Sequence, residues 1–349
     1  MLFNFYIFLL FFLNKKTLSY CKEIIFVEII KYLKLNKFEI IKIRKVINLL
    51  IIDKKKEIYA GHIDIVESGY ISWIKKNFSC ICYKKKIICR GVVDMKGGIC
   101  AFLFLSKNKN FILTNDEENL SIYGTQYIVN ILIYRKKKYY LFYSGEPTSD
   151  SQIGDNIRIS RRGSYNFNLI FIGKQKHCAY IGKNIINYSI QKLIKINKNI
   201  FYNEIFEINN IFSGSGIDNT TPNIFYVKIN YRFFHYKNII LFKKKIFQFL
   251  KKKKNYFKWI FSGIPFICYK NFYLKLIFNS VNYIQNIFPK INFLGGTSDL
   301  RYCYYFYNKS NCFEIGLLNN TIHKTNENSD FDNIYILYLI LKKFKNGIK

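Results

Sequence analysis

The chain has 349 residues, half of them hydrophobic, which is enough to bury the core of one large domain or of two ordinary ones. Its formal net charge of +33 is typical of nucleic-acid-binding proteins. However, Lys, Ile, Asn, Phe and Tyr are enriched along the whole chain, and these are the amino acids of AT-rich codons. Since that bias explains the charge and no RNA-binding signature accompanies it, we predict no nucleic-acid partner. Three lysine clusters are interpreted as solvated helix faces and loops: Lys136–Lys138, Lys243–Lys245 and Lys251–Lys254.

The apolar N-terminal stretch Leu2–Leu13 has three possible interpretations: a signal-peptide core, a short anchor or a buried helix. No basic residue precedes it, no cleavage site of small residues follows it, and it is too short to span a bilayer. We therefore expect a buried first helix and no membrane association.

The nine cysteines show no pairing rhythm, and Cys80-Ile81-Cys82 has one intervening residue where common zinc knuckles have two or more. We interpret all nine as small reduced hydrophobic side chains, which favours a cytoplasmic protein. The chain has only four histidines, so each is a candidate functional residue. His235 lies in no motif and is interpreted as a surface residue.

Strands alternate with helices in the first part of the chain, and polar residues collect where the strands end. This order indicates an α/β domain with a mixed, mostly parallel sheet. The predicted strands are Phe38–Ile43, Val46–Ile52, Glu57–Gly61, Phe111–Thr114 and Tyr139–Ser144. The predicted helices are Lys22–Leu35, Ile99–Leu105 and Tyr123–Ile133.

From Gly163 the predicted order changes to βαββαβ, which indicates an inserted ferredoxin-like α+β unit. Its elements are Tyr165–Ile172, Asn184–Ile196, Ile205–Phe212, Val227–Phe233, Ile239–Leu250 and Tyr256–Phe261. The first domain then resumes with helix Phe272–Phe288, strand Cys312–Gly316 and helix Asn333–Phe344. The predicted boundaries are residues 1–162 and 271–349 for the outer domain and 163–270 for the insertion.

One carboxylate, Asp94, lies within the stretch Arg90–Gly98, which reads RGVVDMKGG. We predict a strand that ends at Asp94 and breaks at Gly97-Gly98. Because the rims of α/β sheets are where ligands and metals bind, Asp94 is a candidate ligand.

Further motifs place histidines and acids at strand ends or in adjoining loops. In His62-Ile63-Asp64 the two polar side chains share one side of a strand, so His62 could bind a metal while Asp64 orients its ring. Glu146 follows a second strand and His323 lies in a late loop. Each residue alone also fits an ordinary surface position.

A run of three acids, Asp116, Glu117 and Glu118, follows strand Phe111–Thr114. Adjacent carboxylates repel one another unless cations sit among them. An acidic loop is the ordinary alternative, but the chain has only 22 acids, which weakens it. A divided role is expected, with one glutamate on a metal and its neighbour transferring protons.

The combined pattern predicts a metal centre with five ligands: His62, Asp94, Glu118, Glu146 and His323. Five nitrogen and oxygen ligands suit two borderline cations that share one bridging carboxylate. Two such metals can polarise a carbonyl group for hydrolysis.

In order, the motifs GHID, RGVVDMKGG, NDEE, GEP and TIHKTNE resemble those of the dinuclear zinc aminoacylase and carboxypeptidase family. The resemblance runs from roughly residue 20 to the end of the chain. It implies a zinc-aminopeptidase-like catalytic domain with an inserted dimerisation domain, and two Zn²⁺ per subunit, with Co²⁺ possible in one site. It implies that His62 and Glu146 hold one metal, and that Glu118 and His323 hold the other. Asp94 would bridge them through a cis Asp94-Met95 peptide.

The resemblance also implies roles for residues that bind no metal. Asp64 would orient His62, and Glu117 would be the general base in hydrolysis of the amide bond of an N-acyl amino acid. His177 would reach the active site of the partner in a homodimer and stabilise the oxyanion, with Tyr180 near its loop. Four further residues match substrate-contacting positions: Arg161, Arg232, Thr297 and Asn319. From the residues alone, Arg232 could instead face solvent, and Thr297 and Asn319 could be ordinary turn residues.

Three positions depart from the family pattern. Asp218 stands where the family has an Asn that helps to bind substrate. The segment Ser106–Asn110 is short, and Asn115 replaces the usual Ser or Ala. Two alternatives therefore stay open: a related deacylase or dipeptidase of the same family, and a non-catalytic basic protein that binds RNA or membrane. The second leaves the five ligands unexplained.

Overall fold

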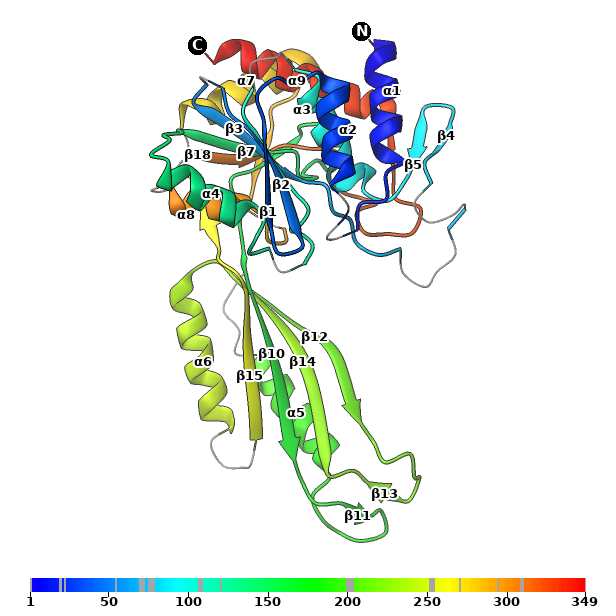
Figure 1. Cartoon of the computed structure of the whole chain (residues 1–349). Helices are drawn as coiled ribbons and strands as arrows, with labels where there is room; N and C mark the ends of the chain where they lie inside the picture. Colours follow the sequence, from blue (N-terminus) through cyan, green and yellow to red (C-terminus); the bar gives the residue numbers. More distant parts are fainter. Residues whose placement is uncertain are drawn as a thin grey trace. The chain divides into compact units, whose positions relative to one another are not determined.

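The computed structural model describes residues 2–18, 21, 23–53, 55–68, 73–74, 79–105, 109–119, 121–198, 204–250, 255–269, 271–293, 295–307 and 311–348. The chain forms two compact units (Figure 1). Unit 1 comprises Met1–Ser160, Ile267–Phe293 and Ser298–Lys349, and unit 2 comprises Arg161–Phe266 and Leu294–Thr297. The catalytic and dimerisation roles assigned to the predicted domains stay predictions.

A mixed sheet of eight strands forms the centre of unit 1. In spatial order its strands are β1 (Glu39–Ile43), β2 (Val46–Ile51), β6 (Phe111–Thr114), β3 (Glu57–His62), β7 (Leu141–Ser144), β18 (Asn311–Glu314), β8 (Asn156–Arg158) and β17 (Lys290–Asn292). The central strands β6, β3, β7 and β18 run parallel to one another. The predicted mixed, mostly parallel sheet is therefore confirmed. Every residue of β6, β3 and β7 is buried, as expected for parallel strands covered on both faces.

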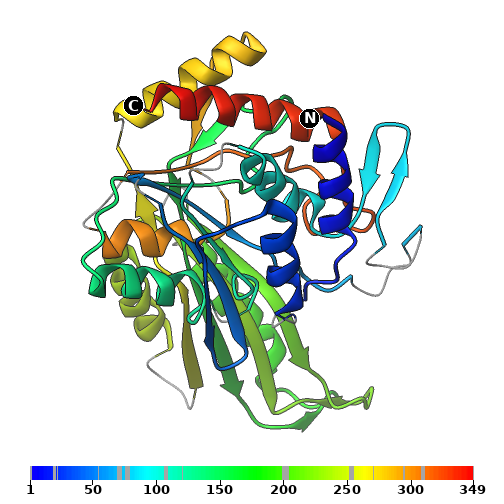
Figure 2. The same ribbon diagram turned by 45° about the horizontal axis from the view of Figure 1, so that its top comes forward.

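Helices pack on both faces of this sheet (Figures 1 and 2). They are α1 (Leu2–Leu13), α2 (Ile24–Leu33), α3 (Gly97–Leu103), α4 (Thr125–Tyr134), α7 (Phe272–Gln285), α8 (Leu300–Phe306) and α9 (Phe331–Gly347). On one face α9 packs against α3 and α7, and on the other α4 packs against α8. Helix α9 turns its buried residues Ile334, Leu337 and Leu341 inward at helical spacing.

The N-terminal stretch forms the buried helix that the sequence predicts. In α1 the side chains of Phe8, Leu9 and Phe12 are fully buried. Rings of Phe5 and Phe8 pack edge-on or tilted against Phe104, which follows α3. Among the described helices, none is both long enough and apolar enough to cross a membrane.

A small sheet in the order β19-β5-β4 joins two distant parts of unit 1. Its strands are β4 (Ile81–Tyr83), β5 (Lys86–Ile88) and β19 (Asn328–Asp330). Strand β5 leads directly into the Asp94 stretch, and β19 follows the TIHKTNE motif. The antiparallel pairing of Asn328 with Ile88 therefore brings these two motifs together.

Unit 2 has the predicted βαββαβ order. Its elements are β10 (Gly163–Ile172), α5 (Ile185–Asn197), β12 (Ile205–Ser213), β14 (Ile224–Phe233), α6 (Tyr236–Leu250) and β15 (Asn255–Gly263). The four strands form an antiparallel sheet in the order β12-β14-β10-β15. Alternate residues of β10 and β14, such as Phe167 and Ile229, share one core with Leu193 of α5 and Phe242 of α6.

The other strands of unit 2 and its borders are only two residues long. They are β9 (Ser160–Arg161), β11 (Lys176–His177), β13 (Thr220–Thr221) and β16 (Phe266–Ile267). The pairing of β11 with β13 places His177 opposite Thr220. His177 therefore lies beside the turn that carries Asp218.

Several features of unit 1 differ from the sequence-based prediction, which did not include the short strands β8, β17 and β19. The strand predicted to end at Asp94 is wrong, because Val92–Lys96 is a tight turn and Gly97 begins α3. Gly91, with φ of 82°, reverses the chain before a strand can form. Helix α8 has no predicted counterpart, because its residues Leu300–Tyr304 are all buried and so lack an amphipathic period.

The predicted lysine clusters differ in their exposure to solvent. Lys136–Lys138 are exposed, as predicted. Lys243 instead donates a hydrogen bond to the Tyr165 hydroxyl (2.8 Å) and lies over the Trp259 ring. Lys251–Lys254 and most of the shortened segment Ser106–Asn110 lie outside the described residues. His235 is exposed, as predicted, and all nine cysteines are free.

Candidate metal centre

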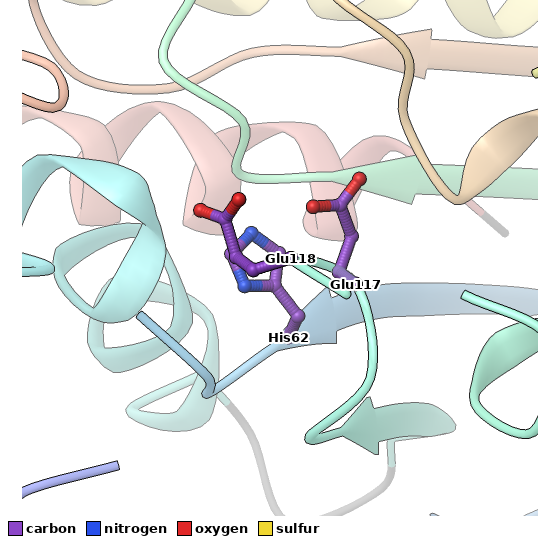
Figure 3. A group of neighbouring side chains, drawn as sticks. All are labelled: His62, Glu117 and Glu118. Carbon is purple, nitrogen blue, oxygen red and sulfur yellow. The ribbon is translucent and has the colours of Figure 1, made fainter. Parts of the chain in front are cut away.

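Three adjacent parallel strands deliver candidate ligands to one edge of the unit 1 sheet. His62 is the last residue of β3 and pairs with Thr114, the last residue of β6. Glu117 and Glu118 follow β6, and their side chains lie beside the His62 ring (Figure 3). Gly145 separates Glu146 from the last residue of β7. Because parallel strands end at the same edge, residues far apart in sequence meet there.

Glycines bring the Asp94 turn close to this edge. A Cβ atom on Gly91 would lie 2.4 Å from the Ile65 side chain, and one on Gly98 would lie 2.6 Å from the Gly145 carbonyl oxygen. These contacts pack the start of α3 directly against the loop that carries Glu146. The Asp94-Met95 peptide is cis, as the family resemblance implies.

Asp94 lies between the two histidines and uses a different oxygen toward each. Its Oδ1 is 3.2 Å from His62 Nε2, and its Oδ2 is 2.9 Å from His323 Nε2. Glu146 Oε1 is 3.8 Å from His62 Nε2, and Glu118 Oε1 is 3.1 Å from His323 Nε2. The ligand atoms thus form two groups that share Asp94: His62, Asp94 and Glu146; and Asp94, Glu118 and His323.

Opposite charges shift the pKa values of these side chains. Hydrogen bonds to Asp94 and Glu118 raise the pKa of His323 to about 10. Burial disfavours the charged form of His62, but hydrogen bonds to Asp64 and Asp94 raise its pKa well above the ordinary value. Burial likewise opposes ionisation of Asp94, yet both histidines hold its pKa below the usual range. The centre therefore favours a carboxylate between two cationic groups, the arrangement that metal ions would also favour.

Asp64 is fully buried and anchors the loop that carries the two glutamates. Its Oδ2 accepts hydrogen bonds from the backbone N–H groups of Glu117 (3.1 Å) and Glu118 (2.9 Å). The nearest Asp64 atom to His62 Nδ1 is the backbone carbonyl oxygen at 3.0 Å, while the carboxylate lies at 3.6 Å. The orienting role predicted for the Asp64 carboxylate stays a prediction, and the same carboxylate also holds the backbone of the acid run.

Glu117 is half-buried beside His62 and Glu118, and these three also form a candidate metal group. Burial raises the pKa of Glu117 well above its ordinary value, and repulsion from Glu118 adds to the shift. A carboxylate with a raised pKa is suited to accept and release protons near neutral pH. Asp116, the third acid of the run, instead accepts hydrogen bonds from the backbone N–H groups of Ile122 and Tyr123.

Asn115, which departs from the family pattern, has a structural role. Its side-chain oxygen accepts a hydrogen bond from the Ile47 N–H (2.9 Å), and its amide group donates to the Cys21 carbonyl oxygen (3.2 Å). Since Asn115 is fully buried, these bonds satisfy its polar atoms and tie the end of β6 to its neighbours.

Most of the predicted substrate contacts belong to unit 2, and local hydrogen bonds hold several of them. In unit 2, Arg161 is buried and donates to the Gly296 carbonyl oxygen (3.5 Å), next to Thr297. Arg232 donates to the side chain of Asn230 (2.7 Å), and exposed His177 accepts from the Ala179 N–H (3.2 Å). In unit 1, Asn319 donates to Asp150 (2.9 Å). Their roles toward a substrate stay predictions.

Two residues without a predicted role form an ion pair next to the turn that carries Asp94. Glu327, in TIHKTNE, is fully buried, and its carboxylate forms an ion pair with Arg90 of RGVVDMKGG at 3.1 Å. Both residues lie in motifs that carry the family resemblance. Acidic side chains are rarely fully buried unless they are paired, so a buried acid in such a motif is a candidate functional residue. The sequence offers no signal that pairs them, because 237 positions separate them.

Residues 58–345 match the model of peptidase family M20/M25/M40. The chain therefore belongs to this family, which confirms the resemblance given by its motifs. It is an enzyme, a metal-dependent hydrolase, and the two ligand groups around Asp94 are its candidate metal-binding residues.

Within this family, the chain is similar to proteins named succinyl-diaminopimelate desuccinylase. The protein of that name from Wigglesworthia glossinidia brevipalpis is 35% identical over 314 residues, which cover 82% of this chain and 83% of that protein. Its counterpart from Orientia tsutsugamushi (strain Boryong) is 35% identical over 296 residues, covering 77% and 74% of the two chains.

Solved structures share the fold at lower identity. The M20 family metallo-carboxypeptidase Sso-CP2 from Sulfolobus solfataricus has a TM-score of 0.77 at 18% identity, covering 97% of this chain and 98% of that one. A tripeptidase from Staphylococcus aureus has a TM-score of 0.80 at 15% identity, covering 99% and 97%. At such identities the likeness extends to the fold alone.

Proposed function

We propose that this enzyme hydrolyses N-succinyl-LL-2,6-diaminopimelate to succinate and LL-2,6-diaminopimelate, a step of lysine and diaminopimelate biosynthesis. The observation that carries the proposal is the pair of ligand groups that share Asp94, with Glu117 beside them. The relatives named for this activity favour the substrate. So do three motifs that the sequence shares most closely with that member: RRGS at 161–164, GGTSD at 295–299 and NNTIHKTNE at 319–327.

The donor set fits two zinc ions per subunit, with Co²⁺ able to occupy one site. It consists of two imidazole nitrogens and three carboxylates, which suit borderline cations better than calcium or magnesium. His62 and Glu146 would hold one ion, and Glu118 and His323 the other, with one oxygen of Asp94 toward each histidine. When bound, the ions would polarise the amide carbonyl and lower the pKa of the attacking water.

The protein's own side chains would move the protons. The Glu117 carboxylate takes a proton from the attacking water and delivers it to the leaving amine nitrogen, a role that its raised pKa supports. Asp64 holds the backbone of Glu117 in place through the hydrogen bond that its carboxylate accepts. General acid–base catalysis of this kind contributes about 10²–10⁴-fold in rate.

Cationic and polar residues of unit 2, together with Asn319 of unit 1, suit a substrate with several carboxylates. Arg161 and Arg232 would pair with these carboxylates, and Thr297 and Asn319 would donate or accept hydrogen bonds. Arg161 already lies beside the loop that holds Thr297, through its contact with Gly296. Asp218 would repel a carboxylate at the position where the family has Asn, so we expect weaker substrate binding there.

We further infer a homodimer in which each copy donates His177 to the active site of the other. Strand β12 is an edge strand of the unit 2 sheet, and its Ile208, Ile211 and Phe212 side chains are exposed. An exposed apolar edge strand is a ready surface for pairing with a second copy. His177 is itself exposed and would stabilise the oxyanion of the tetrahedral intermediate. A biosynthetic role of this kind places the enzyme in the cytoplasm.

Metal analysis combined with a substrate panel tests the proposal. The purified protein should bind about two zinc ions per chain and hydrolyse N-succinyl-LL-2,6-diaminopimelate in preference to N-acetylornithine and dipeptides. Glu117→Gln should keep both metals and lose most turnover. Full metal loading without hydrolysis of the succinyl substrate would refute the assignment, and preference for acetylornithine or a dipeptide would transfer it to another member of the family.

A further inference from the structure

Glu327 is a fully buried carboxylate that binds the backbone of the Asp94 turn. Its Oε1 accepts hydrogen bonds from the N–H groups of Val93 (2.8 Å) and Asp94 (3.2 Å). Its Oε2 accepts from the N–H group of Gly91 (3.0 Å) and from Arg90 Nη1 (3.1 Å). Four donors therefore converge on one carboxylate, and three of them are backbone groups of the turn that presents Asp94.

These N–H groups need an acceptor because the turn provides few of its own. Asp94 and Met95 have non-helical backbone angles, so the regular helix pattern begins only after them. Within the turn, the Lys96 N–H donates to the Gly91 carbonyl oxygen (2.9 Å). Buried backbone donors without an acceptor are costly, so Glu327 supplies the acceptors that a preceding helical turn would supply.

Hydrogen bonds of Glu327 and of its partner Arg90 also connect the Asp94 turn to the segment that carries His323. The backbone carbonyl of Glu327 accepts from the Cys89 N–H (2.9 Å), just before Arg90. Arg90 Nη1 also donates to the Lys324 carbonyl oxygen (3.1 Å), one residue after His323. Arg90 is held in turn by the Glu67 carbonyl oxygen (3.3 Å) and by the Trp73 ring, whose centroid lies 4.8 Å away. One buried ion pair therefore links the Asp94 turn to the His323 loop.

We propose that Glu327 is a positioning residue that fixes the Asp94 carboxylate between His62 and His323, and that it thereby sets metal affinity without touching a metal. This inference rests on the proposed metal-dependent function. A carboxylate is required because its two oxygens accept from four donors, whereas the amide of Gln would place N–H groups against two of them. Groups that orient ligands typically change metal affinity by about 10–100-fold when they are removed.

Glu57 supplies a matched control for a purely structural effect. It is also a buried glutamate in unit 1, and its carboxylate lies 3.6 Å from the Lys345 ammonium. It begins β3, whereas His62 ends the same strand, so it sits at the edge of the sheet opposite the ligands. Glu57→Gln therefore removes a buried charge from the same unit and leaves the Asp94 turn intact.

The experiment is a zinc titration of the metal-free full chain against a competing chelator dye, alongside thermal unfolding of each metal-free variant. Glu327→Gln should bind zinc about 10–100-fold more weakly and should change the visible absorption spectrum of bound Co²⁺, which reports ligand geometry. Glu57→Gln should lower the melting temperature while its zinc affinity and Co²⁺ spectrum match those of the unsubstituted protein.

Arg90→Lys keeps the charge but loses the planar guanidinium, whose Nη1 donates to Glu327 and the Lys324 carbonyl oxygen while its Nη2 donates to the Glu67 carbonyl oxygen. It should give an intermediate loss of zinc affinity, and it tests the inference if Glu327→Gln does not fold. Wild-type zinc affinity and an unchanged Co²⁺ spectrum in the folded variants would overturn the positioning role. Since these measurements need no substrate, a failure to hydrolyse the succinyl substrate would leave them standing and would count only against the proposed function.

Discussion

The candidate ligands at the edge of the unit 1 sheet and the predicted substrate contacts in unit 2 are organised differently. At the sheet edge, five candidate ligands converge into two groups, and buried carboxylates hold the backbone around them. In unit 2, Arg232 and His177 form hydrogen bonds to sequence neighbours, and His177 is exposed.

The difference indicates that the two sets of residues are held in place in different ways. Hydrogen bonds within one compact unit hold the backbone that carries the candidate ligands, which preorganises their geometry. Of the predicted substrate contacts in unit 2, His177 is exposed, so a bound substrate or a second copy of the chain would complete its surroundings, whereas Arg161 is buried and Arg232 is half-buried. Substitutions of the five candidate ligands should therefore act on metal binding, and substitution of His177 on turnover alone.

Asp94→Ala should have the largest effect, because it removes the carboxylate that both ligand groups share. We expect both metals to be lost together, with affinity falling by more than the roughly 100-fold seen when an orienting group is removed. His62→Ala and His323→Ala should each weaken mainly one site. Metal stoichiometry after dialysis against graded chelator would compare the three variants, and equal loss in all three would contradict the bridging role.

His177→Ala should lower turnover by about 10²–10³-fold, as for loss of an oxyanion-stabilising group, without changing metal content. If His177 acts across a two-fold interface, mixing His177→Ala with Glu117→Gln should restore activity. In each mixed dimer one site has its own Glu117 and receives His177 from the other copy, so random mixing should restore about a quarter of the activity.

A mixture of Glu117→Gln with His62→Ala provides the control for subunit exchange. Both substitutions lie at the same sheet edge, so no mixed dimer has a complete site and activity should stay absent. No recovery in the His177 mixture would place His177 outside the partner's active site. Recovery in this control would show that mixing restores activity without exchange of His177, and it would remove the support that the His177 mixture gives.

Asp64→Asn should have a smaller effect. The amide oxygen can still accept from one of the two N–H groups of Glu117 and Glu118, but the charge that holds both is gone. We expect kcat to fall by about 10–100-fold with both metals retained at saturating zinc. Steady-state kinetics with parallel metal analysis would show this, and an unchanged kcat would mean that the loop keeps its position without Asp64.

The smallest effect concerns the stability of the metal-free protein. The pKa of His323 is raised from 6.5 to about 10, so its contribution to stability is fully present below pH 6.5 and is lost as the pH rises toward 10. The difference in melting temperature between the unsubstituted protein and His323→Ala should therefore shrink over this range in the presence of chelator. Because His323 is partly exposed, we expect about 1 kcal/mol or less. A difference that grows with pH would contradict the shift.

Much of the candidate site could be predicted from the sequence because each ligand follows a local signal. Strand β6 has the same first and last residues as the predicted strand. The last residues of β3 and β7 lie within one residue of those predicted. An acid or histidine directly after such a run must lie at the sheet edge. The βαββαβ order of unit 2 follows equally from alternating and helical periods.

Other features could not be predicted, because no local pattern encodes them. The tight turn at Val92–Lys96 resembles a strand in sequence, and its shape depends on the Gly91 conformation and on contacts with Ile65 and Gly145. Helix α8 is buried on all sides and shows no period.

The sequence by itself therefore determined the family, the order of the elements and the set of ligands. Only the tertiary structure decided which Asp94 oxygen faces which histidine and which buried carboxylates hold the ligand loops. The physical reason is that these are hydrogen bonds between distant segments: Glu327 and Asp94 are 233 positions apart, and Asp64 and Glu118 are 54 apart. Such contacts form only when the strands and loops pack together, and no short stretch of the chain specifies them.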